Sequence, residues 1–236
     1  MAEDSPDLSA LRARRQEVTQ ALLGDTIGLT DEQWGAPSRL PGWTRAHIAS
    51  HVARNADGLS RVVRQLHDGQ PTGLYPDSAT ARTDIERGSE RGALELQIDL
   101  DSSAERLHRA FSQLLKMRRD QLVPLTPSLT VRLDAIPVVR MNEVVLHHID
   151  LDVGFSWGDV GDDVAAWLLE YNIGRVGRNS AYPAIRLVSD SGVTGLIGGP
   201  GHPRVVDGPD HLLLGWLTGR LPGQQIAPGL PDLQTR

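Results

Sequence analysis

The chain has 236 residues, of which 39% are hydrophobic and 23% are charged, and its formal net charge is −6. This length is typical of one or two domains, and the apolar fraction is sufficient for a hydrophobic core. The net acidity and the dispersed basic residues argue against a nucleic-acid or anionic-membrane partner. The sequence contains no cysteine, which excludes disulfides, thiolate ligands and a cysteine nucleophile. Any thiol chemistry therefore needs a thiol from outside the chain.

The N-terminus and the hydropathy pattern favour a cytoplasmic protein. The first ten residues, MAEDSPDLSA, are acidic and lack the apolar segment of a signal peptide. No apolar run approaches the ~18 residues that a membrane-spanning helix requires. We therefore expect a soluble protein.

Apolar spacing predicts helices through the first two thirds of the chain. A helix is expected over 8–23, ending at Gly24, and a short helical turn is expected to start at Thr30. The segment GAPSRLPGW then predicts a loop. Thr44 is a typical N-cap for a long helix over about 45–68.

Three further helices complete this part of the chain. They are predicted over 78–88, over about 102–121 and from Pro137 to Gly154, and a short hairpin is expected within 123–137. Long helices joined by a mixture of short and long connections predict a four-helix bundle. Metal sites in such bundles are commonly built from side chains on facing helices.

The pattern changes after Gly154. A helix is predicted over 161–178, followed by three β-like runs, AIRLVS, VTGLIG and PRVVDG, which are separated by turns. A last helix is expected over about 209–219, and the Gly- and Pro-rich tail from Pro222 is expected to be extended. We therefore predict an α+β protein with two domains, an N-terminal bundle over 1–157 and a small α+β domain over 158–236.

Three ionisable residues point to a metal site in the bundle. Glu143 and His147 are four residues apart, so they project from one face of a helix. His51 lies in the apolar stripe of another helix. Brought together, the three would provide an N/O ligand set with one open coordination position, which is typical of a catalytic zinc ion.

Each of these residues also has an ordinary structural explanation. Glu143 could be a surface carboxylate on an amphipathic helix. A single histidine on an apolar face, such as His51, is more often a hydrogen-bonded core residue than a ligand. A carboxylate buried without a partner costs several kcal/mol, however, so a charge among Val139, Val144 and Val145 calls for compensation.

Other polar residues could change the ligand set. His47, one helical turn before His51, and Asp150, three residues after His147, are alternative ligands. His148 projects about 100° away from His147 and is not expected to bind the metal. The four remaining histidines are expected in surface or packing positions: His67, His108, His202 and His211.

Two arginines are candidates for binding an anionic substrate. Arg82 lies in the segment after the His51 helix, and Arg220 follows the last predicted helix in the motif LTGRLPG. An arginine beside a Gly/Pro turn can present a planar fork to a carboxylate. Each could equally be a solvated surface residue. The loop GGPGHP, over 198–203, lacks the Lys-Ser/Thr ending of a phosphate loop and is discounted.

The segments LPGWTRAHIASHVARNA and MNEVVLHHIDL, together with ARTDIERGS and GWLTGR, resemble the mycothiol-dependent maleylpyruvate isomerase family. The resemblance extends over nearly the whole chain and implies a DinB-like four-helix bundle followed by a small α+β domain. It implies zinc, or another divalent metal, bound by His51, Glu143 and His147. It also implies mycothiol as cofactor, with Arg220 as a catalytic and cofactor-binding residue and Arg82 as a second cofactor-binding residue.

The reaction that the resemblance implies is the cis–trans isomerisation of maleylpyruvate to fumarylpyruvate, a step of aromatic catabolism. Zinc would favour the thiolate form of mycothiol, which is the competent nucleophile. The thiolate would add to the double bond, the resulting single bond would rotate, and the thiolate would leave. Three alternatives stay open: a mycothiol S-transferase, a zinc hydrolase, and a non-catalytic metal-binding module whose zinc has a fourth protein ligand.

Overall fold

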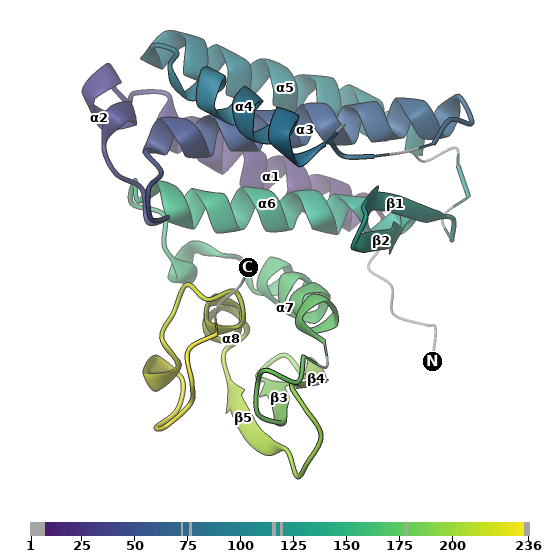
Figure 1. Cartoon of the computed structure of the whole chain (residues 1–236), viewed down its shortest axis with the longest axis vertical. Coiled ribbons are helices and arrows are strands. Elements are labelled where there is room, and N and C mark those ends of the chain that lie inside the picture. Colours follow the sequence, from purple (N-terminus) through teal and green to yellow (C-terminus); the bar gives the residue numbers. More distant parts are fainter. Residues whose placement is uncertain are drawn as a thin grey trace. The chain divides into compact units, whose positions relative to one another are not determined.

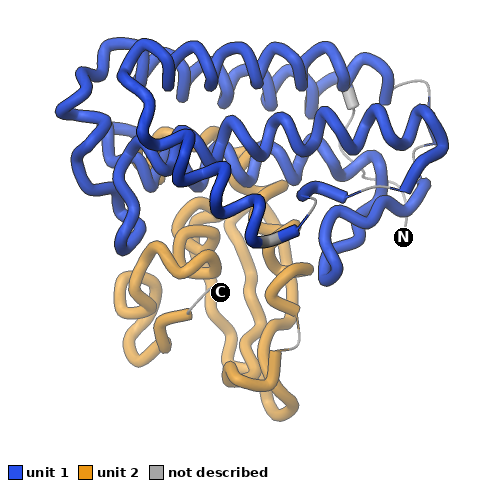
Figure 2. Tube along the Cα trace, turned by 45° about the horizontal axis from the view of Figure 1, so that its top comes forward, with its two compact units in different colours: residues 1–155 blue, residues 156–236 orange. Residues whose placement is uncertain are grey.

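The structure is a computed structural model that describes residues 8–71, 73–75, 77–114, 117–118, 120–177 and 179–233. The chain divides into two compact units, Met1–Phe155 and Ser156–Arg236, which Figure 2 shows in two colours. The first unit is largely helical and the second combines helices with a small sheet, so the predicted α+β class is confirmed.

The long helices of the first unit are α1 Leu8–Thr26, α3 Arg45–His67, α5 Ala93–Leu114 and α6 Ile136–Leu151 (Figure 1). Helix α3 packs against α5 and α6, and α1 packs against α6 and α5. The short helix α4 lies against α3. The elements are α1 Leu8–Thr26, α2 Asp31–Gly35, α3 Arg45–His67, α4 Ser78–Ser89, α5 Ala93–Leu114, β1 Leu122–Thr126, β2 Leu129–Arg132, the 3-10 turn η1 Leu133–Ala135 and α6 Ile136–Leu151.

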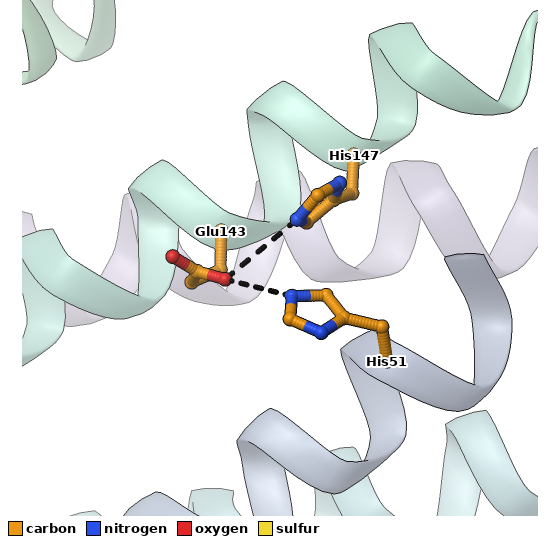
Figure 3. Close-up of side chains that lie close together, drawn as sticks. All are labelled: His51, Glu143 and His147. Carbon is orange, nitrogen blue, oxygen red and sulfur yellow. Dashed lines mark hydrogen bonds and ion pairs between the residues drawn. The ribbon is translucent and has the colours of Figure 1, made fainter. Parts of the chain in front are cut away.

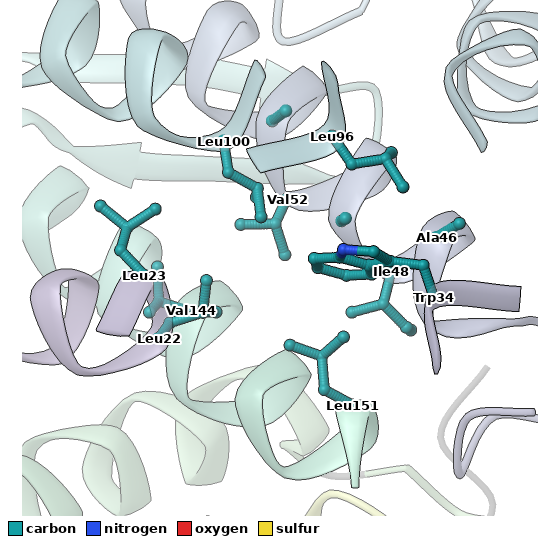
Figure 4. Packing of buried hydrophobic residues seen from close by; sticks show 12 residues of the cluster. Leu22, Leu23, Trp34, Ala46, Ile48, Val52, Leu96, Leu100, Val144 and Leu151 are labelled. Carbon is teal, nitrogen blue, oxygen red and sulfur yellow. The ribbon is translucent and has the colours of Figure 1, made fainter. Parts of the chain in front are cut away.

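Helix α3 begins where the sequence predicts. The Thr44 side chain accepts a hydrogen bond from the His47 backbone, and the His47 side chain accepts one from the Thr44 backbone, which forms a capping box. From there Ile48 and Val52 turn inward. Figure 4 shows them in a core cluster with residues of the other helices, including Leu22, Trp34, Leu96, Leu100, Val144 and Leu151.

Two helices differ from their predicted bounds. Helix α1 continues through Gly24 to Thr26, whose hydroxyl donates to the Leu22 carbonyl. Helix α5 begins at Ala93, about nine residues before the predicted start, and within the described residues it ends at Leu114. Its first turns contain two acidic residues and exposed leucine and isoleucine side chains, which mask the apolar stripe. Leu96 and Leu100 nevertheless supply a buried face.

The second unit is a small α+β fold. The three predicted β runs form one sheet in the order β4-β3-β5, with β3 antiparallel to β4 and parallel to β5. Helix α7 packs on α8 and on β4, and α8 also contacts β3 and β5. The elements are η2 Trp157–Asp159, α7 Asp162–Val176, β3 Ile185–Ser189, β4 Thr194–Ile197, β5 Arg204–Gly208, α8 Asp210–Leu217 and η3 Gly223–Gln225.

The Gly- and Pro-rich tail is not simply extended, as the sequence predicts. It contains the 3-10 turn η3, and Leu230 and Leu233 are buried. The Trp216 indole N–H donates to the Pro231 carbonyl over 2.8 Å. These contacts fold the tail back onto α8. In the described parts of the chain, no helix is long and apolar enough to cross a membrane.

Candidate metal centre

Helix α6 is buried on almost every side. Along Ile136–Leu151, Val138, Glu143 and His147 are half-buried and the other residues are fully buried. The Glu143 and His147 side chains are 22% and 11% exposed. Because they lie one helical turn apart, they share the stripe of α6 that reaches solvent. The polar residues of this helix that can bind a ligand are therefore those on its accessible stripe.

Helix α3 presents His51 to this stripe. The Nε2 atom of His51 lies 3.1 Å from Oε2 of Glu143, and Nε2 of His147 lies 3.7 Å from the same oxygen (Figure 3). The two imidazole rings meet edge to face, with centroids 4.5 Å apart. One ligand atom from each of the three residues lies within 4.8 Å of the other two. The structure therefore brings together the three residues that the sequence singles out.

Arg39, which precedes α3, and Arg45, the first residue of α3, contact the end of α6. The Arg45 guanidinium donates to the carbonyls of Leu151 and Asp152 over 2.7 and 2.9 Å. The Arg39 backbone N–H donates to the Asp150 carbonyl over 2.8 Å. The last carbonyls of a helix have no partner within the helix, so these donors satisfy them. The motif that precedes His51 thus holds α3 against the helix that carries Glu143 and His147.

The carboxyl group of Glu143 is ionised at neutral pH. Burial by itself raises its pKa, but the hydrogen bond with His51, the electrostatic interactions with His147 and His51 and the charge of Arg140 lower the pKa to about 2. Burial lowers the pKa of His147, although the hydrogen bond with Asp150 opposes the shift. A low histidine pKa leaves the imidazole neutral, and a neutral imidazole together with an ionised carboxylate is the form that binds metals.

A buried cation, Arg140, lies one turn before Glu143 and is 2% exposed. It donates to the Val52 carbonyl over 2.9 Å and to Oδ1 of Asn55 over 2.8 Å. Burial lowers the Arg140 pKa only to about 10, so the group stays charged and compensates Glu143. Sequence reasoning missed this residue. The signal available was an arginine within an otherwise apolar helical run, which needs an anionic counterpart.

The two residues that the sequence offers as alternative metal ligands, His47 and Asp150, make other contacts. His47 is engaged in the capping box, and its Nε2 lies 3.2 Å from Oε2 of Glu86 at helix α4. Asp150 is completely buried, with Oδ2 2.9 Å from Nδ1 of His147. In the described part of the chain, neither belongs to the group of residues placed to hold a metal ion.

The remaining histidines lie outside the cluster as well. His148, 1% exposed, stacks on Phe155 with ring centroids 3.9 Å apart, and its Nε2 lies 3.0 Å from Oδ2 of Asp25. His108 contacts the buried Arg15 through Nδ1 at 3.2 Å. His67 is exposed beside Asp68, His202 is exposed and His211 is half-buried.

The two candidate arginines lie in different units. Arg82 is exposed on α4, the helix that packs against α3. Arg220 follows α8 in the second unit, where it is half-buried and its guanidinium donates to the Thr218 carbonyl over 3.1 Å. Their proposed roles in binding substrate and thiol remain predictions.

The donor set fits a divalent metal ion. Two imidazole nitrogens and one carboxylate oxygen suit zinc and several other first-row ions. Within the described residues, the cluster contains three side chains, which is the number that leaves a coordination position open.

The segment that contains the candidate metal centre matches a known protein family. The sequence profile of the mycothiol maleylpyruvate isomerase N-terminal domain matches residues 15–152, more than half of the chain. The chain belongs to this family. The match includes both α3 and α6 and the whole triad. Membership places the chain among maleylpyruvate isomerase-like enzymes.

Solved structures agree with this fold. The chain is similar to a crystal structure of mycothiol-dependent maleylpyruvate isomerase, with 22% identity and a TM-score of 0.79 over 91% of this chain and 90% of the other. A variant of that isomerase in which alanine replaces a histidine gives 21% identity with the same TM-score and coverage. At these identities the likeness shows the fold. The search for similar curated proteins found no match.

Proposed function

We propose that this chain is a zinc- and mycothiol-dependent isomerase that converts maleylpyruvate to fumarylpyruvate. The observation that carries the proposal is the convergence of His51, Glu143 and His147 in a member of the maleylpyruvate isomerase family. These residues would hold the metal ion through their facing nitrogen and oxygen atoms. A zinc ion in such a site supplies Lewis acidity, which lowers the pKa of a coordinating thiol so that the thiolate forms at neutral pH.

The charges of the chain's own residues favour an anionic thiolate at this site. Glu143 contributes one negative charge and the two imidazoles contribute none, so a divalent ion keeps a net positive charge. Arg140 adds a buried positive charge nearby. Helix α6 leaves the stripe with Glu143 and His147 partly open, which gives small molecules access. A neutral thiol would gain less from this environment than a thiolate.

The reaction needs an external nucleophile because the chain has no cysteine. The thiolate sulfur of mycothiol forms a bond to one carbon of the cis double bond, and the π electrons move into the conjugated carbonyl. The remaining carbon–carbon single bond rotates. Those electrons then re-form the double bond in the trans geometry and expel the thiolate. The thiol is regenerated and the mass of the substrate is unchanged.

Arg220 and Arg82 are the proposed partners for anionic groups. Maleylpyruvate has two carboxylates, and a planar guanidinium can bind a carboxylate through two parallel hydrogen bonds. The half-buried position of Arg220 suits such a contact better than full exposure, because screening by water is weaker there. Arg82 is exposed, so we assign it the weaker contact.

The direct test is incubation of the purified, zinc-loaded full chain with maleylpyruvate and mycothiol, followed by chromatography and mass spectrometry. We expect fumarylpyruvate of unchanged mass, with the thiol not consumed. His51→Ala should abolish turnover, and His67→Ala, which changes an exposed histidine outside the cluster, should not.

Each other outcome rejects the isomerase. A stable thiol adduct would support the S-transferase, and addition of water would support the hydrolase. Full turnover in thiol-free buffer would contradict the mechanism. A metal-loaded protein that leaves the substrate unchanged would support the non-catalytic module.

A further inference from the structure

The two imidazoles of the triad differ at their second ring nitrogen. Nδ1 of His147 lies 2.9 Å from Oδ2 of Asp150, a carboxylate that is completely buried. Nδ1 of His51 is also buried, and no hydrogen-bond partner lies within reach of it in the described structure. In the candidate metal centre, Nδ1 of His147 therefore has a hydrogen-bond partner and Nδ1 of His51 does not.

The contact between Nδ1 of His147 and Oδ2 of Asp150 bears on which nitrogen of His147 carries the proton. A carboxylate oxygen is an acceptor, so we assign the proton of this hydrogen bond to Nδ1 of His147. Its Nε2 then keeps a lone pair, which is directed toward Glu143. The distance of 3.7 Å between Nε2 and Oε2 is too long for a hydrogen bond, as expected for two acceptors.

His51 is held in the opposite state. Its Nε2 lies 3.1 Å from Oε2 of Glu143, which is an acceptor, so the Nε2–H group of His51 donates a hydrogen bond to the carboxylate. To bind a metal through Nε2, His51 has to move this proton to Nδ1. His147 needs no such change.

We propose that Asp150 is a positioning residue that presets His147 as the metal ligand, by holding its proton on Nδ1 and fixing the ring. This inference rests on the metal site of the proposed function and adds a role to a residue that is not itself a ligand. A carboxylate behind a ligating histidine orients the ring and increases its basicity, and its loss typically weakens metal binding 10- to 100-fold.

The chain provides its own control in the neighbouring histidine. His148 is also buried and also faces a carboxylate, since its Nε2 lies 3.0 Å from Oδ2 of Asp25. It lies outside the metal cluster of the described residues. Asp25→Asn, a change on α1, therefore removes a carboxylate beside another histidine of α6 and leaves the residues of the candidate centre unchanged.

The first measurement is the Zn²⁺ affinity of the full chain, obtained by competition with a chromophoric chelator. We expect Asp150→Asn to bind Zn²⁺ about 10- to 100-fold more weakly than the unmodified chain, and Asp25→Asn to stay within about twofold of it. An unchanged affinity in Asp150→Asn, or an equal loss in both variants, would overturn the inference.

The second measurement needs no substitution. In the metal-free chain labelled with ¹⁵N, the couplings between ring nitrogens and ring protons show which nitrogen of each histidine is protonated. We expect the proton on Nδ1 of His147 and on Nε2 of His51. A proton on Nε2 of His147 would refute the role of Asp150 even if Asp150→Asn failed to fold.

The two measurements separate this inference from the proposed function. If the unmodified chain binds no Zn²⁺, the proposed metal chemistry fails and the NMR result alone decides whether Asp150 orients His147. If the unmodified chain binds Zn²⁺ and Asp150→Asn binds it equally well, the inference fails and the proposed function stands.

Discussion

The bundle and the C-terminal unit contain different kinds of functional residue. In the bundle, three side chains that could hold a metal ion, a buried counter-charge and a carboxylate that contacts one of the histidines lie together on two helices. In the described part of the C-terminal unit, no group of three ionisable side chains is placed to hold a metal ion. Its candidate residue, Arg220, is a single cation after a helix. Binding a metal ion requires several converging side chains, which in the described residues are found in the bundle, whereas anion recognition can depend on one well-placed arginine.

The strongest test of this contrast is removal of a ligand from the bundle. We expect His51→Ala and Glu143→Ala to lower Zn²⁺ affinity by at least about 100-fold, because two remaining donors cannot hold the ion against buffer and chelators. His202→Ala, which changes an exposed histidine of the C-terminal unit, should keep full metal content. Elemental analysis after dialysis measures the result. Stoichiometric zinc in both ligand variants would reject the assigned site.

A smaller effect is expected from Arg220→Ala, which tests the other side of the comparison. Loss of a charge-assisted contact costs roughly 2–4 kcal/mol, so kcat/KM should fall tens- to hundreds-fold. Zinc content should not change, because arginine is not a metal ligand. Arg220→Lys should restore only part of the activity, since lysine lacks the planar fork. Unchanged kinetics for substrate and thiol in Arg220→Ala would make the residue irrelevant to catalysis.

The smallest effect concerns Tyr75, a half-buried residue of the bundle. Burial, with the charge of Glu143, raises its pKa to about 12, although a hydrogen bond with Asn55 opposes the shift. The pKa of Tyr75 is higher in the folded chain than in the unfolded chain, so folding favours the protonated phenol. The contribution of Tyr75 to stability is fully present below pH 10 and is lost as the pH rises toward 12. The metal-free chain should therefore lose stability relative to Tyr75→Phe, by about 1 kcal/mol at pH 11.

Urea unfolding of the two proteins at several pH values measures this difference. At pH 8 both side chains are uncharged, so the gap between Tyr75→Phe and the unmodified chain is the reference. A gap that stays constant up to pH 11 would contradict the expected shift.

The sequence predicts those features of the site that depend on local geometry. Glu143 and His147 could be placed together because four residues make about one helical turn. The capping role of Thr44 is equally local, and the structure confirms it. His51 could be selected because it occupies an apolar stripe, and the family resemblance points to the same residue.

The contacts that hold the site together could not be predicted in the same way. The guanidinium of Arg45 contacts the carbonyl of Leu151, 106 residues away, and the sequence contains no periodicity that connects the two. Asp150 could be recognised as polar and close to His147, but spacing alone does not separate a ligand from a hydrogen-bond partner of a ligand. The start of α5 was missed because exposed and acidic residues obscure the stripe of Leu96 and Leu100.

The separation of His51 and Glu143 by 92 residues determines when the centre can first exist. A ribosome delivers α3 long before α6, and chains are synthesised at about 5–20 residues per second, so for several seconds the growing chain has His51 without its partners. An ion that met the chain then would find one imidazole and no pocket. For the proposed metal site, selection among ions would therefore depend on the spacing and number of donors in the finished bundle, and not on which ion reaches the nascent chain first.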